Sequence, residues 1–110
     1  MTKVRYVDKK NCQELVLNGH ADDKIVCAGI SAISQTLIAN LMREEAADNI
    51  RMDYKMETPG EMEIIAWLTD ESRETIRMMF HFTMEGLRRI CEDYPGHIEF
   101  VKEEKNNGSV

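Results

Sequence analysis

Two hydrophobic spacings alternate along the chain, and together they predict five strands and two helices. Apolar residues at every second position indicate strands with one buried face, and apolar residues three or four positions apart indicate helices that bury one stripe. The clearest strand carries Ile50, Met52, Tyr54 and Met56 in strict alternation with charged residues. Segments with strand spacing cover residues 3–8, 15–17, 50–57, 62–68 and 98–102.

Two longer segments, residues 27–43 and 72–94, have helical spacing instead. The apolar stripe of the first consists of Ile30, Ile33, Leu37, Ile38 and Leu41. The stripe of the second consists of Ile76, Met79, Phe80, Leu87, Ile90 and Tyr94. Thr69 or Asp70 is placed to cap the second helix by accepting an early backbone N–H, and residues 95–96 (Pro-Gly) end it.

The predicted order is therefore ββαββαβ, which favours an α+β fold with a mostly antiparallel or mixed sheet and both helices on one face. Polar turns are expected at residues 8–11 and at Thr58-Pro59-Gly60. We expect residues 1–102 to form a single domain, because 110 residues support one core. Residues 103–110 are polar and predict a flexible tail.

Composition excludes several classes of function. The net charge is -6 and no basic run exceeds two residues, which argues against direct nucleic-acid binding. No apolar stretch is expected to be long enough to cross a bilayer, and residues 1–10 lack the apolar core of a signal peptide. Three cysteines without a Cys-x-x-Cys pair argue against a disulfide framework. These features predict a cytoplasmic protein that does not bind membranes.

The candidate chemistry lies between the second strand and the first helix. His20 follows the strand, and Cys27 lies at or near the start of the helix. Cysteine proteolysis needs an imidazole that takes the thiol proton and later delivers it to the leaving amine. A helix N-terminus favours a thiolate and offers unpaired N–H groups to an oxyanion. The six intervening residues, 21–26, are few enough to fold back and bring both side chains together.

Residue spacing alone also allows a structural interpretation. A cysteine that follows Ile25 and Val26 is more often a small buried hydrophobe than a nucleophile. A histidine that follows a glycine at a strand end is usually a surface residue. On spacing alone, both interpretations of His20 and Cys27 stay open.

The stretch from residue 18 to residue 41 resembles a known family. Gly19-His20-Ala21, followed by Ile25-Val26-Cys27-Ala28 and Ser31, is similar to the signature of the ribosomal-processing cysteine proteases, the Prp family. The resemblance implies an α+β cysteine endopeptidase with a His-Cys dyad and no cofactor, which forms homodimers. Such enzymes remove a short N-terminal extension from a bacterial large-subunit ribosomal protein and cut after an aromatic residue.

The resemblance assigns roles residue by residue. His20 matches the general base and Cys27 the nucleophile. Gly19 and Ala28 flank these two residues as supporting positions, and Ser31 matches a serine one helical turn beyond Cys27. Because positions i and i+4 share a helix face, Ser31 is placed to orient a side chain or substrate in the same cavity. The alternative for Ser31 is a hydrogen bond back to the Cys27 carbonyl.

The link between His20 and Cys27 departs from the family pattern. Family members have several more residues here, rich in glycine, which form a mobile lid. This chain has a shorter link with Asp22, Asp23 and Lys24, and Lys24 replaces a typical aspartate. The shorter link predicts a more open cleft or a different choice of substrate.

The two acidic residues of this link, Asp22 and Asp23, have several possible roles. Near the dyad they would stabilise an imidazolium and oppose a thiolate. They are alternatively a solvated loop or caps of the helix. Gly29, which replaces an alanine of the family pattern, is explained by a close helix–helix or subunit contact.

Other functions stay open beside the ribosomal substrate. The shorter link also fits a peptidase that processes a phage structural protein, or an inactive module that binds a peptide or a ribosomal partner. His20, His81 and His97 lack the spacing of a metal site, so no metal ligands are assigned. Most methionines have core spacing and are expected to fill gaps. Ile65 and Trp67 share the second face of their strand, where a partner subunit of a homodimer would cover them.

Overall fold

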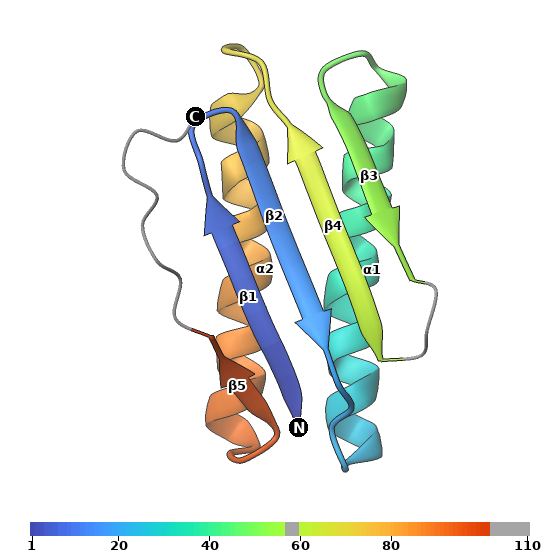
Figure 1. The fold of residues 1–110 in the computed structure, drawn as a ribbon, viewed down its shortest axis with the longest axis vertical. Helices are drawn as coiled ribbons and strands as arrows, with labels where there is room; N and C mark the ends of the chain where they lie inside the picture. Colours follow the sequence, from blue (N-terminus) through green and yellow to red (C-terminus); the bar gives the residue numbers. More distant parts are fainter. Residues whose placement is uncertain (57–59, 102–110) are drawn as a thin grey trace.

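The computed structural model describes residues 1–56 and 60–101, and Figure 1 shows its elements in the predicted ββαββαβ order. The elements are β1 (Thr2–Asp8), β2 (Cys12–Asn18), α1 (Lys24–Ala46), β3 (Arg51–Lys55), β4 (Glu61–Trp67), α2 (Arg73–Asp93) and β5 (Ile98–Phe100). The predicted Thr58-Pro59-Gly60 turn lies partly outside the described residues. Lys102 and the 103–110 tail lie wholly outside them.

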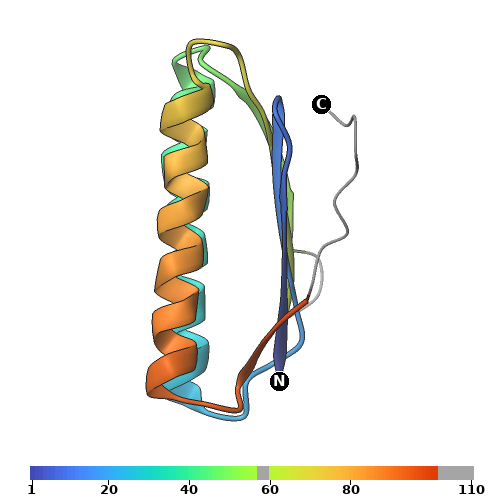
Figure 2. The ribbon, with the colours of Figure 1, turned by 90° about the vertical axis from the view of Figure 1, so that its left-hand side faces the viewer.

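The strands form one mixed sheet in the order β3-β4-β2-β1-β5. Neighbouring strands are antiparallel except β1 and β5, which are parallel. Both helices lie side by side against one face of this sheet, as Figure 2 shows. The predicted fold class is therefore confirmed.

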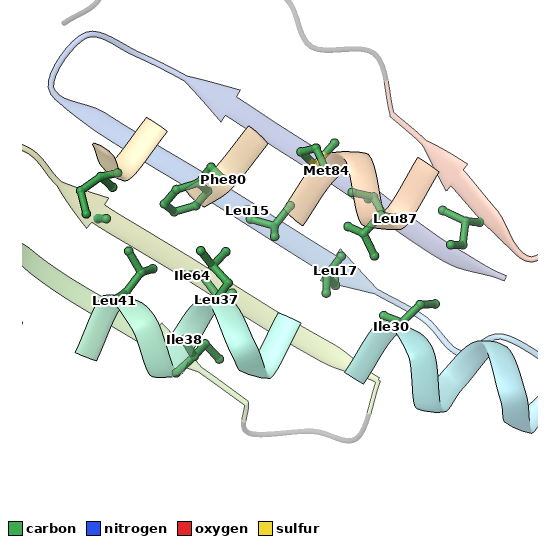
Figure 3. Close-up of a cluster of buried hydrophobic side chains, with 14 of the residues drawn as sticks. Leu15, Leu17, Ile30, Leu37, Ile38, Leu41, Ile64, Phe80, Met84 and Leu87 are labelled. Atoms are coloured by element: carbon green, nitrogen blue, oxygen red, sulfur yellow. The ribbon is translucent and has the colours of Figure 1, made fainter. Parts of the chain in front are cut away.

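The core lies between the sheet and the helix pair (Figure 3). Leu15 of β2 and Ile64 of β4 are paired in register and fully buried. Leu41 of α1 and Phe80 of α2 are also fully buried against the sheet. Alternate strand residues and one stripe of each helix thus share one apolar layer, as the two spacings require.

Two glycines let the helices approach closely. A Cβ on Gly29 of α1 would lie 3.1 Å from Ile90 Cδ1 of α2, and a Cβ on Gly86 of α2 would lie 2.9 Å from Ile33 Cδ1 of α1. Each glycine therefore receives an isoleucine from the opposite helix. The expected helix–helix contact at Gly29 is confirmed.

Details at the element ends differ from the predictions. Helix α1 begins at Lys24, three residues before Cys27, because the Asp23 carboxylate caps it. The expectation that Thr69 or Asp70 caps α2 is wrong, because the cap position is Ser72 and no side chain caps the helix. Thr69 Oγ1 accepts the Ser72 backbone N–H at 3.2 Å, before α2 begins at Arg73. Tyr54 and Tyr94 are 43% and 39% exposed. Their predicted burial is wrong, because Tyr54 lies on the edge strand β3 and Tyr94 follows the end of α2.

The expectation about membrane-spanning length is also wrong. Helix α1 is 23 residues long and apolar enough to cross a bilayer by length and composition alone. Core helices of other proteins meet the same criterion. Here α1 buries Val26, Leu37 and Leu41 under the sheet, so these residues form part of the core.

Candidate active site

The predicted site residues meet at one end of the sheet, where β2 ends, α1 begins and β4 begins. Gly19 turns the chain out of β2 with a φ of 99°, and its N–H donates to the Gly60 carbonyl at 2.8 Å. A cavity of about 420 Å³ opens at this junction. Its walls are formed by Thr2, Leu17, Gly19, His20, Ala21, Cys27, Ile30, Ser31, Ser34, Gln35, Met56, Gly60, Glu61 and Met62.

His20 is exposed on the cavity wall, and its ring packs against Gly60. A Cβ built on Gly60 would lie 2.6 Å from His20 Cε1 and 2.8 Å from Cδ2, and closer still to Nε2. The distal half of the imidazole therefore rests directly on the Gly60 backbone.

Cys27 is a half-buried free thiol on the same cavity wall. Its Sγ donates a hydrogen bond to the Ala21 carbonyl at 3.0 Å. This bond spans the link between β2 and α1 and holds the thiol proton on a backbone oxygen. The sequence thus places both members of the predicted dyad at one cavity, with the thiol directed towards Ala21.

The start of α1 differs from the predicted oxyanion site. The Asp23 carboxylate accepts the N–H groups of Ile25 at 2.7 Å and Val26 at 3.2 Å, and the Asp23 carbonyl accepts the Cys27 N–H at 3.0 Å. The expectation that these N–H groups are unpaired is therefore wrong. Cys27 lies one turn inside the helix, and the proposed role of Asp23 as a cap is confirmed.

The remaining predicted positions divide into two groups. Gly19 and Ser31 line the cavity, whereas Asp22, Asp23 and Ala28 do not. The Ser31 side chain is exposed on the cavity wall. The back-bond considered for Ser31 is made by Ser34 instead, whose hydroxyl donates to the Ile30 carbonyl at 2.7 Å.

Several cavity residues were missed by sequence reasoning. Gln35 lies one turn beyond Ser31, so continuation of the Cys27–Ser31 spacing along the helix would have identified it. Met56 and Met62 also line the cavity, although the sequence assigned the methionines mainly to the core. Gly60 was interpreted as a turn residue, and its place under His20 depends on β4 lying beside β2.

The described residues show no group of three or more His, Cys, Asp or Glu side chains arranged to hold a metal ion. His81 does not line the cavity. Its Nε2 lies 3.6 Å from a carboxylate oxygen of Asp8.

Comparisons with known proteins agree with this fold. A structure of the ribosomal processing protease Prp from S. aureus with a covalently linked product peptide matches with a TM-score of 0.74 at 23% identity, covering 94% of this chain and all (100%) of that chain. The same protease with a substrate peptide matches with a TM-score of 0.73 at 21% identity, with equal coverage of 94% and 100%. SMU.848 from Streptococcus mutans matches with a TM-score of 0.67 at 21% identity, covering 91% of this chain and 95% of its own.

Sequence comparison supplies the family. No curated protein shows significant similarity to the chain. The family model described as cysteine protease Prp, however, matches residues 1–99, which is nearly the whole chain. The chain therefore belongs to the cysteine protease Prp family and is a hydrolase of the cysteine protease class.

Proposed function

We propose that the chain is an endopeptidase in which Cys27 is the nucleophile and His20 the general base. The observation that carries this proposal is the shared cavity of about 420 Å³, which both side chains line. Membership of a cysteine protease family supports it, because a thiol and an imidazole on one cavity wall are the groups that this chemistry requires.

The proposed reaction begins when the Cys27 thiol turns from the Ala21 carbonyl towards His20. The imidazole takes the thiol proton, and the sulfur attacks the scissile carbonyl to form a tetrahedral intermediate. Its collapse breaks the peptide C–N bond, His20 protonates the leaving amine, and a thioester to Cys27 remains. Water, activated by His20, then hydrolyses the thioester and restores the thiol.

The proposed substrate is the short N-terminal extension of a bacterial large-subunit ribosomal protein, cut after an aromatic residue. Two solved structures similar in fold are named as ribosomal processing proteases, which favours this substrate class. Leu17, Ile30 and Met62 give the cavity an apolar wall. Such a wall fits a large apolar side chain beside the scissile bond.

The direct test uses synthetic peptides that span the N-termini of the host's large-subunit ribosomal proteins, with the products identified by mass spectrometry. A second peptide set spans the capsid proteins of any resident phage. We expect one cut after an aromatic residue in a ribosomal peptide. Cleavage confined to the capsid peptides would replace the ribosomal substrate with a phage one.

The Cys27→Ala and His20→Ala variants are the matched controls for this test. We expect both variants to bind the intact peptide that the wild type cuts, but to leave it uncut. If the wild-type protein binds a ribosomal peptide and leaves it intact, the chain is an inactive binding module and the proposal is wrong.

We also propose that the chain forms a homodimer through the outer side of its helix layer. Residues 25–42 of α1 contain no charged side chain, although α1 covers only one face of the sheet. Phe82 of α2 is 65% exposed beside a groove of about 330 Å³ between the helices, whose lining includes Ile33 and Met79. A protruding ring beside an apolar groove suits a two-fold interface, in which each copy fills the other's groove.

The sheet face suits a partner less well than the sequence suggested. Trp67 is exposed there, but the Arg51 guanidinium lies 5.5 Å from its ring centre, and Arg5 and Glu14 form an ion pair nearby on the same face. Light scattering of the wild type should give about twice 12.7 kDa. We expect Phe82→Glu to give the monomer mass and Trp67→Glu to leave the dimer intact. The reverse result would assign the interface to the sheet.

A further inference from the structure

Gly60, the first described residue after the β3–β4 connection, contacts the end of β2 at two points. Its carbonyl accepts the Gly19 N–H at 2.8 Å, immediately before His20. The distal atoms of the His20 ring occupy the space that a Cβ on Gly60 would need. Gly60, which lies directly before β4, therefore contacts both the backbone of Gly19 and the side chain of His20.

No residue with a side chain fits this position without displacing the ring. A Cβ at 2.6 Å from His20 Cε1 and 2.8 Å from Cδ2 is closer than any stable contact between carbon atoms. The backbone of Gly60 also has a φ of 84°, which other residues adopt only with strain. The steric and backbone requirements are separate, and a suitable control separates them experimentally.

We infer that Gly60 is a positioning residue that holds the His20 imidazole on the cavity wall that Cys27 shares. The inference rests on the proposed role of His20 as general base. The ring packs directly against the Gly60 backbone, which limits its movement on that side. A side chain at residue 60 would push the imidazole away from this position. A displacement of about 1 Å in a catalytic group lowers catalysis by as much as roughly 100-fold.

The control for backbone strain is Gly96, which has a φ of 90° and open space where a Cβ would lie. Gly96→Ala introduces the same unfavourable backbone conformation as Gly60→Ala, but without a steric clash. Because the exposed His20 ring can turn aside from a Cβ at residue 60, we expect Gly60→Ala and Gly96→Ala to lower the Tm by similar amounts. A much larger loss in Gly60→Ala that persists in a His20→Ala background would show that the contact with His20 is not what requires glycine.

The functional test measures the rate at which iodoacetamide labels Cys27 between pH 6 and 9, with the labelled residue identified by mass spectrometry. We expect Gly60→Ala to slow labelling at pH 7 about tenfold, to the rate of His20→Ala, while Gly96→Ala keeps the wild-type rate. The double variant should be no slower than His20→Ala alone.

The outcomes separate the two proposals. If His20→Ala slows labelling and Gly60→Ala does not, the positioning role of Gly60 is wrong and the dyad stands. If His20→Ala leaves labelling unchanged, the dyad is wrong, and the positioning role is overturned with it.

Discussion

The two ends of the β1–β2 hairpin are built in opposite ways. At the hairpin turn, Asp8 accepts hydrogen bonds from Gln13 Nε2 at 2.6 Å and from Arg77 of α2 at 2.9 and 3.2 Å. The Tyr6 hydroxyl donates to Gln13, which is fully buried. At the other end, His20 and Cys27 line an open cavity, and a glycine backbone rather than a polar network supports the imidazole.

The hairpin turn contributes mainly to the stability of the fold, whereas the cavity end carries the residues of the proposed reaction. The polar network ties the sheet to α2 and satisfies a buried amide, which would otherwise destabilise the fold. Burial and the nearby Asp8 charge raise the pKa of Tyr6, so its hydroxyl stays protonated as a donor. The cavity end leaves the Cys27 thiol and the His20 imidazole, the proposed dyad, accessible to a substrate. Substitutions at the two ends should therefore change different measurements.

The largest effect is expected for Cys27→Ala. This variant removes one sulfur and its single hydrogen bond to Ala21, so the free energy of unfolding should hardly change. Peptide cleavage should fall by about a thousandfold or more, because the variant lacks a nucleophile. Cleavage at the wild-type rate would contradict the assignment of Cys27.

At the opposite end, Asp8→Asn should destabilise the protein without changing cleavage. The variant loses the charge that Arg77 and Gln13 bind, so we expect the free energy of unfolding to fall by about 1.5 kcal/mol in urea denaturation. Asp70→Asn is the matched control, because Asp70 pairs with Arg73 while 92% exposed. The control should unfold like the wild type, and an equal loss in both variants would argue against the network.

Acid should weaken the hydrogen bonds that Asp8 accepts at the hairpin turn. Burial tends to raise the pKa of Asp8, but hydrogen bonds from Arg77 and Gln13 outweigh burial and lower this pKa below its ordinary value. The stabilisation is thus fully present above about pH 4, the unfolded value, and is lost as the pH falls through the lower folded value. Urea denaturation from pH 6 down to pH 2 should show a steeper loss for the wild type than for Asp8→Asn. Equal slopes would contradict this account.

The smallest effect is expected for Ser31→Ala. Ser31 lines the cavity one turn beyond Cys27, so loss of its hydroxyl should lower cleavage by about threefold with unchanged stability. Ser34→Ala is the comparison, because Ser34 is fully buried and bonds its own helix. It should affect unfolding more than cleavage. Full activity in Ser31→Ala would leave Ser31 only a place on the cavity wall.

The fold was predictable because the two hydrophobic spacings switch cleanly between strands and helices. The start of α1 was less predictable, since its first residue, Lys24, and its cap, Asp23, are polar and lie before the apolar stripe. The apparent membrane-spanning length of α1 was missed because Ser31, Ser34 and Gln35 interrupt its apolar run, although none of them is charged.

The site was predictable where its residues are close in sequence. His20, Cys27 and Ser31 lie within one short stretch and were identified together. Gly60 and Met62 join them only because β4 pairs with β2, a long-range contact that local spacing does not encode. The sequence offered a cap role and a solvent-exposed role for Asp23 without deciding between them, because a carboxylate that caps a helix and one that faces solvent have the same sequence pattern.

The most direct test of the central claim is competitive labelling of the thiols near neutral pH. Cys27 should react with iodoacetamide well before Cys12, since burial raises the pKa of the Cys12 thiol, and before Cys91. In His20→Ala, labelling of Cys27 should slow to the rates of these two internal controls. If all three thiols of the wild type react equally slowly, His20 does not activate Cys27, and the proposed dyad is contradicted.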